Sequence, residues 1–208
     1  MKKDIKIPEI NIFINTVSKY SKQYKLTEHI YIDAIKNFKQ RKLSELTKKD
    51  TISILEPFLL KWGRMSRVLG KKGCEKIRIK IVELNNQLIK YREITLLDFD
   101  INEEKEEIKR IYNIFKSIKA INRKVGQTAT SKILHIINPE LFPLWDSKIR
   151  PKFGIYSGNA SEYIAFMIEQ KRWLSDENFK ISVDKLANKY GVSTLKVIDQ
   201  YNWYRAWQ

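Results

Sequence analysis

Two side chains near the middle of the chain have types and positions that could carry chemistry. Asp146 is a lone carboxylate after a loop that contains Pro139 and Pro143, and such a carboxylate can activate water as a general base. His135 precedes it on a predicted helix, where a histidine can contact a ligand or fill the core. Asp146 can also cap the short segment that begins at Ser147, and a cap would fix the carboxylate in place.

Residues that commonly bind metal ions are scarce in this sequence. Cys74 is the only cysteine, which excludes an internal disulfide and any zinc site built from several thiolates. The histidines are limited to His29 and His135, so we expect no structural metal. The sequence therefore predicts a site that works without a metal or another cofactor.

The elements that must hold these side chains are predicted to be helices. Only 5 prolines and 7 glycines interrupt the chain, and apolar residues recur at steps of three and four. Asn102 is the predicted N-cap of one helix, because glutamates follow it at the positive end of the helix dipole. The predicted helices cover residues 9–21, 26–40, 51–68, 74–92, 102–120, 127–137, 163–173, 183–190 and 194–206.

This pattern predicts an all-α protein with one helical domain over residues 1–208, although two small lobes would also fit this length. Residues 74–92 alternate enough to suit a strand, and we favour a helix there. No apolar run approaches the roughly 20 residues of a membrane span, and the N-terminus lacks the apolar core of a secretion signal. We therefore expect a cytoplasmic protein without a membrane partner, whose oligomeric state is open.

The stretch KVGQTATSKILHIINPELFPLWDSKIR, residues 124–150, places a glycine turn before a helix and then a single aspartate after a proline-marked loop. This order resembles that of the helix-hairpin-helix DNA glycosylase superfamily, in its endonuclease III-like group. The resemblance covers residues 106–150, where Val125 and Gly126 match the second half of the family's Gly-hydrophobic-Gly hairpin. Asp146 follows Gly126 by 20 residues, which fits the family's spacing from the hairpin to its catalytic aspartate.

The resemblance implies an enzyme that removes a damaged or mismatched base from double-stranded DNA. Asp146 would then activate water and stabilise the oxocarbenium-like charge that develops as the glycosidic bond breaks. Trp145 and His135 are the candidates for the pocket that receives the extruded base. The exposed N–H groups at the helix start would approach a DNA phosphate, a contact that carries no sequence information.

Two departures from the family's pattern bear on this activity. Lys124 replaces the first hairpin glycine, which leaves the motif incomplete but supplies a cation that could contact phosphate. Thr128 stands where bifunctional members carry the lysine that forms a Schiff base, so the resemblance implies a monofunctional glycosylase. Lys132 lies one helical turn onward on the same face and is the second-ranked alternative for lyase chemistry.

The excess of positive charge supports a nucleic-acid partner and a nucleoid-associated location. Lys and Arg total 40 against 24 Asp and Glu, which gives a formal net charge of +16. A dense basic run surrounds Gly70 and Gly73, which are predicted to mark a turn that presents lysines to phosphates. The predicted DNA-binding residues are Arg64, Arg67, Lys71, Lys72, Lys124, Val125, Gly126, Gln127, Thr128, Lys148 and Arg150.

Two other functional classes fit the same charge. Residues 183–201 resemble a helix-turn-helix, with Gly191 and Ser193 at the spacing of that motif, and its second helix would enter the major groove. The chain would then be a non-catalytic DNA-binding protein or a regulator. An RNA-binding or structural interaction protein is the third class that the charge allows.

Overall fold

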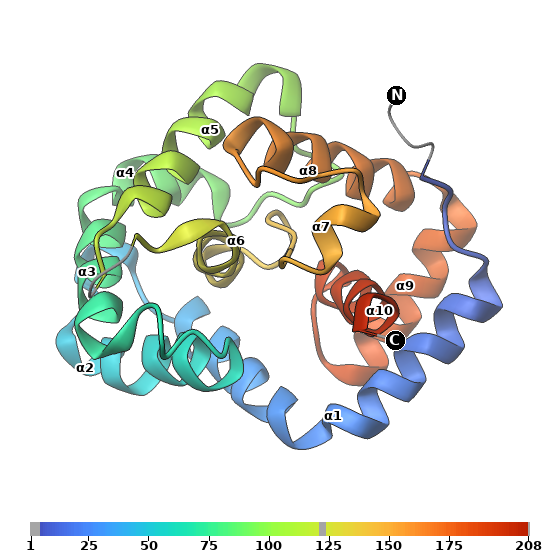
Figure 1. Cartoon of the computed structure of the whole chain (residues 1–208), viewed down its shortest axis with the longest axis horizontal. Helices are drawn as coiled ribbons and strands as arrows, with labels where there is room; N and C mark the ends of the chain where they lie inside the picture. Colours follow the sequence, from blue (N-terminus) through green and yellow to red (C-terminus); the bar gives the residue numbers. More distant parts are fainter. Residues whose placement is uncertain (1–4, 121–123, 208) are drawn as a thin grey trace.

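The computed structural model describes residues 5–120 and 124–207, and its helices confirm the all-α prediction (Figure 1). The longer helices are α1 (Ile10–Lys39), α3 (Gly70–Glu83), α5 (Ile101–Ser117), α6 (Gly126–Ile137), α8 (Ala160–Leu174), α9 (Glu177–Tyr190) and α10 (Thr194–Trp207). The short helical turns are η1 (Leu43–Glu45), α2 (Lys48–Asp50), η2 (Thr51–Leu55), η3 (Pro57–Trp62), α4 (Asn85–Leu88), η4 (Ile89–Tyr91) and α7 (Ile149–Lys152). Within the described residues, β-type pairing is limited to one bridge between Lys119 and Lys124.

The buried side chains of these helices form one connected core. Figure 1 shows the helices arranged around the link from α6 to α7, residues 138–148, which lies near the centre of the molecule. Within this link, the Trp145 ring lies 5.0 Å from the Tyr163 ring and 5.7 Å from the Phe166 ring. Because large aromatic rings bury much apolar surface, this cluster holds the segment that carries Asp146 in place.

The first helix bends where a break between two helices was predicted. The segments 9–21 and 26–40 belong to one helix, α1, and Tyr24 within it has the non-helical angles φ −110° and ψ 15°. The Thr27 hydroxyl donates to the Tyr24 carbonyl oxygen at 3.0 Å, which gives that carbonyl a partner at the kink. The two predicted helices are therefore one helix with a kink at Tyr24.

The third predicted helix, residues 51–68, ends six residues early at Trp62 and is wound more widely than an α-helix. The Gly63 N–H donates to the Phe58 carbonyl oxygen at 2.7 Å, five residues back, as π-type winding requires. Arg64 then adopts a left-handed φ of 54°, which is uncommon for a residue with a side chain. The chain thus turns sharply between η3 and α3.

The turn predicted at Gly70 and Gly73 lies just before them, at residues 66–68, and Gly70 opens α3 with a left-handed φ of 56°. A Cβ atom on Gly73 would lie 3.0 Å from the Ala120 Cβ, so the glycine allows the chain after α5 to approach closely. Residues 74–92 are helical as predicted, divided among α3, α4 and η4. The part of the basic run from Lys71 onward therefore lies along a helix, whereas Arg64 and Arg67 lie in the turn before it.

Helix α5 begins at a different cap from the one predicted. The Asp100 carboxylate accepts the N–H groups of Asn102 and Glu103 at 2.9 and 3.2 Å, so Asp100 is the N-cap and the prediction of Asn102 is wrong. An aspartate at this position also places negative charge at the positive end of the helix. The cap fixes the first turn of α5, the helix that precedes the glycine turn.

The connection from α5 to α6 closes with a left-handed glycine. The Val125 N–H donates to the Ile118 carbonyl oxygen at 2.9 Å, and Gly126 opens α6 with a φ of 75°. This angle suits glycine because it has no Cβ to clash with the following carbonyl. The turn predicted to start at Asn122 begins outside the described residues.

The C-terminal helices are core elements and do not suit a DNA-reading helix-turn-helix. Gly191 ends α9 with a left-handed φ of 65°, and α10 packs against α1. Lys196 on α10 is 0% exposed, and the Thr194 hydroxyl donates to the Glu140 carboxylate at 2.8 Å. Residues 183–201 thus form a helix, a turn at Gly191 and a second helix, but the first turns of α10 are buried and are not presented as a groove-reading helix would be.

Candidate functional site

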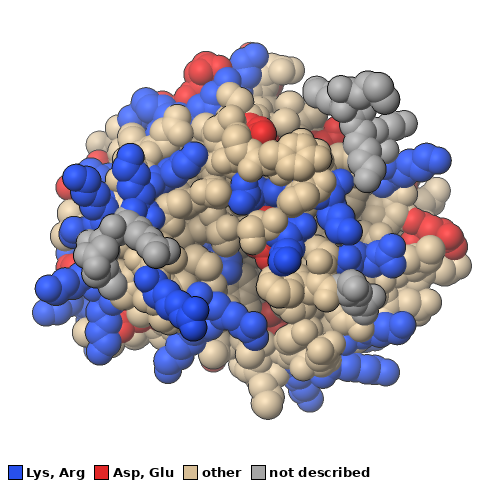
Figure 2. Space-filling model, viewed as in Figure 1, with Lys and Arg blue, Asp and Glu red and all other residues tan. Residues whose placement is uncertain are grey.

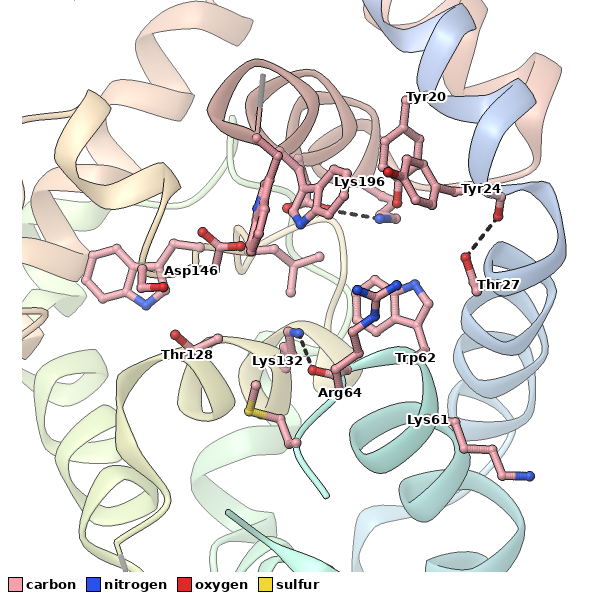
Figure 3. Close-up of a pocket in the computed structure, with 18 residues that line it drawn as sticks. Tyr20, Tyr24, Thr27, Lys61, Trp62, Arg64, Thr128, Lys132, Asp146 and Lys196 are labelled. Carbon is pink, nitrogen blue, oxygen red and sulfur yellow. Dashed lines mark hydrogen bonds and ion pairs between the residues drawn. The ribbon is translucent and has the colours of Figure 1, made fainter. Parts of the chain in front are cut away.

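A cavity of about 320 Å³ opens between α1, η3, α6, the link from α6 to α7 and α10 (Figure 3). Four of these elements come from distant parts of the sequence, so only the fold assembles it. Its volume is at the lower end of the range for small-molecule pockets. The lining residues are Tyr20, Tyr24, Thr27, Lys61, Trp62, Gly63, Arg64, Met65, Thr128, Lys132, Leu144, Trp145, Asp146, Ser147, Lys196, Asp199, Trp203 and Trp207.

Asp146 lies in the wall of this cavity and is held by the backbone of the following turn. Its Oδ1 atom accepts the N–H groups of Lys148 and Ile149 at 2.7 and 2.8 Å. The Oδ2 atom makes no hydrogen bond to any residue that the structure describes. One carboxylate oxygen thus caps the turn before α7 while the second is available to a ligand in the cavity.

Lys132 lines the same cavity from α6. Its Nζ atom donates to the Gly63 carbonyl oxygen at 2.8 Å and lies 5.1 Å from the centre of the Trp62 ring. Burial lowers the pKa of Lys132 to about 8, while the charges of Asp199 and Asp146 act in the opposite direction. A lysine with such a pKa is partly a neutral amine near physiological pH, which is the form that acts as a nucleophile.

The floor of the cavity contains a buried ion-pair network. The Lys196 ammonium lies 2.9 Å from Asp199 Oδ2 and 3.5 Å from Glu28 Oε2. Burial alone would lower the pKa of Lys196, but the two carboxylates hold it well above its usual range. Glu28 also accepts the Tyr20 hydroxyl at 2.9 Å and the Trp62 indole N–H at 3.0 Å. The network joins α1, η3 and α10 beneath the cavity.

Aromatic rings from both ends of the chain form one wall of the cavity. The Trp203 ring packs edge-on against the Tyr24 ring at 4.9 Å and stacks with the Trp207 ring at 5.5 Å. Such rings can stack against a planar ligand. Figure 3 shows Tyr20, Tyr24 and Trp62 grouped on the side of the cavity opposite Asp146.

These wall and floor residues are not among the site residues that the sequence predicts. Lys196 and Asp199 did carry a usable signal, because they stand three residues apart in a segment with the apolar residues Leu195, Val197 and Ile198. Charged side chains within a buried helical stretch are paired or functional. The aromatic residues of α1 carried no such signal, since aromatic residues at helical spacing are usually core.

Five of the predicted site residues line the cavity: Arg64, Thr128, Lys132, Trp145 and Asp146. Arg64 is exposed and lies in the turn that follows η3. Trp145 is only 1% exposed, and its indole N–H donates to the Gln127 carbonyl oxygen at 3.1 Å. Trp145 thus supports the wall from behind more than it presents a ring to the cavity.

His135 does not reach the cavity, so its expected place in a base pocket is not realised. The ring is 0% exposed and is held between the Tyr31 hydroxyl at Nε2 and the Phe142 carbonyl oxygen at Nδ1, both at 2.7 Å. Burial lowers the pKa of His135 to about 3, although the bond to Phe142 opposes the shift. His135 is therefore a neutral core residue that joins α1 to α6.

Two predicted phosphate contacts are also turned inward. Arg150 is 7% exposed; its guanidinium donates to the Asp146 carbonyl oxygen at 3.3 Å and fills space that a side chain at Gly158 would need. Val125 is 3% exposed, so its side chain belongs to the core. Both were expected at the surface, and packing around Trp145 keeps Arg150 inside instead.

The other predicted phosphate contacts lie on accessible surface. Lys124 and Lys148 are exposed, and Gly126, Gln127 and Thr128 are partly exposed in the first turn of α6. No side chain among the described residues caps this helix start. Figure 2 shows Lys and Arg side chains around a central recess on this face of the molecule. Arg64 and Arg67, between η3 and α3, and Lys71 and Lys72, in the first turn of α3, are also exposed.

The described part of the chain offers neither a metal cluster nor a membrane span. No three residues among its His, Cys, Asp and Glu side chains come together in a way that could hold a metal ion. None of its helices combines the length and the apolar character that crossing a membrane would take. The cavity itself is lined mainly by amine, carboxylate and aromatic side chains.

Comparison with known proteins places this site within a family. No curated protein and no solved structure matches the chain. A family model described as a family of unknown function, DUF6308, matches residues 70–206, which is well over half of the chain. The match includes Lys132, Asp146 and Asp199, whereas α1 and Trp62 precede it. The chain belongs to this family, DUF6308.

Proposed function

We propose that the protein binds double-stranded DNA and hydrolyses the N-glycosidic bond of a damaged or mismatched base. The observation that carries the proposal is the position of Asp146 in the wall of a cavity with aromatic rings, with one carboxylate oxygen held by two backbone N–H groups. A cavity that accepts an extruded base needs such walls and one group beside the sugar. The residues 106–150 that resemble a helix-hairpin-helix glycosylase supply that carboxylate.

The carboxylate would act on water and on the sugar. Its free oxygen would take a proton from a water molecule as the water attacks the anomeric carbon, and its charge would stabilise the oxocarbenium-like transition state. The C–N bond breaks, and the base departs with the bonding electrons and gains a proton. The uncapped start of α6, together with Lys124 and Lys148, would hold the neighbouring phosphates.

A panel of duplexes with oxidised, alkylated, deaminated and mismatched bases tests the proposal. We expect release of at least one base without added metal, and Asp146→Asn should lower turnover about 10²- to 10⁴-fold. Asparagine can still accept from the backbone at a cap, so the fold and the salt-dependent binding should persist. Asp33→Asn changes an exposed carboxylate on α1 and should have no effect. Salt-dependent binding without release of any base would make the protein a non-catalytic DNA binder.

A second activity, lyase cleavage through Lys132, is favoured by one specific observation. The Nζ atom lies in the cavity with Asp146, and burial lowers its pKa to about 8. The neutral amine would attack the anomeric carbon and displace the base, and opening of the sugar would give an iminium that loses the 3′ phosphate by β-elimination. Thr128, at the position of the usual lysine, is the reason to rank this activity second.

Borohydride trapping distinguishes the two activities. A lyase would form a reduced protein–DNA adduct, and the yield would rise as the pH increases through about 8, because the ammonium must lose its proton to attack. Lys132→Ala should abolish the adduct. Lys61→Ala is the matched control, since Lys61 lines the cavity but Figure 3 shows its ammonium pointing away from Asp146. Base release without any adduct would leave the hydrolytic activity alone.

A further inference from the structure

The floor of the cavity presents a buried carboxylate that the proposed reaction does not use. Asp199 is 8% exposed, lines the cavity, and accepts the Lys196 ammonium at Oδ2. Lys196 also faces Glu28, so two carboxylates share one cation, and burial raises the pKa of Asp199 although the Lys196 ammonium acts in the opposite direction. A carboxylate in such a place strongly favours a ligand that brings hydrogen-bond donors.

A donor lies in the same cavity on another helix. Lys132 on α6 uses one N–H on the Gly63 carbonyl oxygen, and the group has further hydrogens to donate. The cavity therefore offers an acceptor from α10 and a donor from α6, and the rings of Trp62 and Trp203 line it as well. A flat ring with an N–H beside a carbonyl complements this arrangement, because the ring can stack while its edge satisfies both charges.

We propose that this cavity selects a lactam edge, in which Asp199 accepts the ring N–H and Lys132 donates to the adjacent carbonyl oxygen. Uracil and hypoxanthine, which form by deamination, carry this edge, and so do the normal bases thymine and guanine. The inference rests on the proposed function, since it takes a nucleobase as the occupant. It goes further by naming the substrate class and by giving Asp199 a role in specificity rather than in bond breaking.

A matched pair of free bases tests this selection on the full chain. Hypoxanthine has the N–H, whereas 1-methylhypoxanthine carries a methyl group in its place, and quenching of Trp62, Trp203 and Trp207 fluorescence would report binding of either. We expect the methylated base to bind at least about 10-fold more weakly, because a buried acceptor would lose its partner. Equal binding of the two bases, or binding of neither, would overturn the proposal.

A variant of Asp199 tests whether this residue causes the preference for hypoxanthine over 1-methylhypoxanthine. Asp199→Asn should reduce the difference between the two bases towards equality, while Asp33→Asn should keep it. Thermal unfolding shows whether Asp199→Asn folds, and the wild-type comparison of the two bases decides the question even if it does not. Preserved discrimination in a folded Asp199→Asn protein would assign the recognition elsewhere and contradict the role of Asp199.

Failure of this inference is distinguishable from failure of the proposed function. If the protein prefers hypoxanthine through Asp199 but releases no base from duplexes, the proposed ligand class stands and the proposed glycosylase activity is wrong. If the protein excises bases without any preference for uracil or hypoxanthine lesions, the proposed activity stands and the proposed lactam selection is wrong. The duplex panel and the free-base titration thus answer separate questions.

Discussion

Asp146 shows how one side chain can have both a structural and a chemical role. The cap and the catalytic carboxylate looked like alternatives in the sequence, yet Oδ1 accepts two backbone N–H groups and Oδ2 accepts none from the described residues. Holding one oxygen fixes the direction of the other, which removes the rotational freedom that a surface aspartate would have. Substitution of Asp146 by asparagine therefore removes the negative charge while the side chain can keep its position as the cap of the turn.

His135 gives a pH prediction at the same scale. Its pKa is about 3 in the fold against an ordinary value of 6.5, so the unfolded chain binds a proton between these pH values and the folded chain does not. The free energy of unfolding is therefore highest above pH 6.5, and the part of it that depends on a neutral His135 is lost progressively as the pH falls from 6.5 towards 3. Between pH 7 and pH 5 we expect this residue to cost about 2 kcal/mol of unfolding free energy. Chemical denaturation at the two pH values measures the loss.

Two variants assign this pH dependence to the buried ring. His135→Gln should remove most of the difference between pH 7 and pH 5, whatever it does to the absolute stability. His29→Gln changes an exposed histidine and should leave the difference intact. The same loss of stability in the His135→Gln protein would place its origin in other groups.

At the scale of elements, the end of η3 decides where Lys132 is held. Gly63 closes the wide turn with its N–H on the Phe58 carbonyl oxygen, and its own carbonyl oxygen accepts the Lys132 ammonium. A Cβ atom here would lie 2.5 Å from the Leu59 carbonyl oxygen, closer than any side chain can come to backbone. The glycine is thus needed for the turn and for the lysine contact across the cavity.

Replacing this glycine tests the role of the turn. Gly63→Ala should destabilise the fold by about 1–3 kcal/mol, because the backbone has to move to admit the methyl group. Gly191→Ala is the control, since no atom lies within 4 Å of the added Cβ and only the left-handed φ of 65° resists it. That control should cost about 1 kcal/mol. Denaturant unfolding that ranks Gly191→Ala as the more damaging change would contradict this account of the turn.

The charge of the whole molecule is divided between internal pairs and open surface. Arg78 pairs with Glu75 at 2.6 Å, and Lys76 donates to the Lys119 carbonyl oxygen at 2.8 Å, so part of the basic run serves the fold. Lys71 and Lys72 in the same run are exposed on α3. Only the exposed cations can displace counterions from DNA, so the net charge of +16 overstates the binding surface.

The salt dependence of DNA binding measures that surface. Lys71→Ala with Lys72→Ala should make the slope of log affinity against log salt shallower by up to about 2, since each neutralised phosphate contributes about 0.9. Lys185→Ala with Lys189→Ala removes the same charge from exposed positions on α9 and is the control. Equal changes in slope for the two double variants would indicate binding by overall charge rather than by the α3 surface.

The sequence by itself determined the helical class, because apolar spacing and the scarcity of glycine and proline report local structure. It also indicated Asp146 and Lys132, since a lone aspartate and a helical lysine near a glycine turn are visible as residue types and spacings. It placed helix ends less well, as the N-cap at Asp100 and the end of η3 at Trp62 show, because competing helix ends differ by small energies.

Only the tertiary structure decided which side chains meet at the cavity. His135 and Lys132 stand three residues apart on α6, yet one is enclosed by Tyr31 and the other faces Asp146. Burial depends on what packs against a helix face, and α1 and α10 come from opposite ends of the chain. For the same reason Asp199 could be recognised as a floor residue only after folding brought it below the cavity that Asp146 borders.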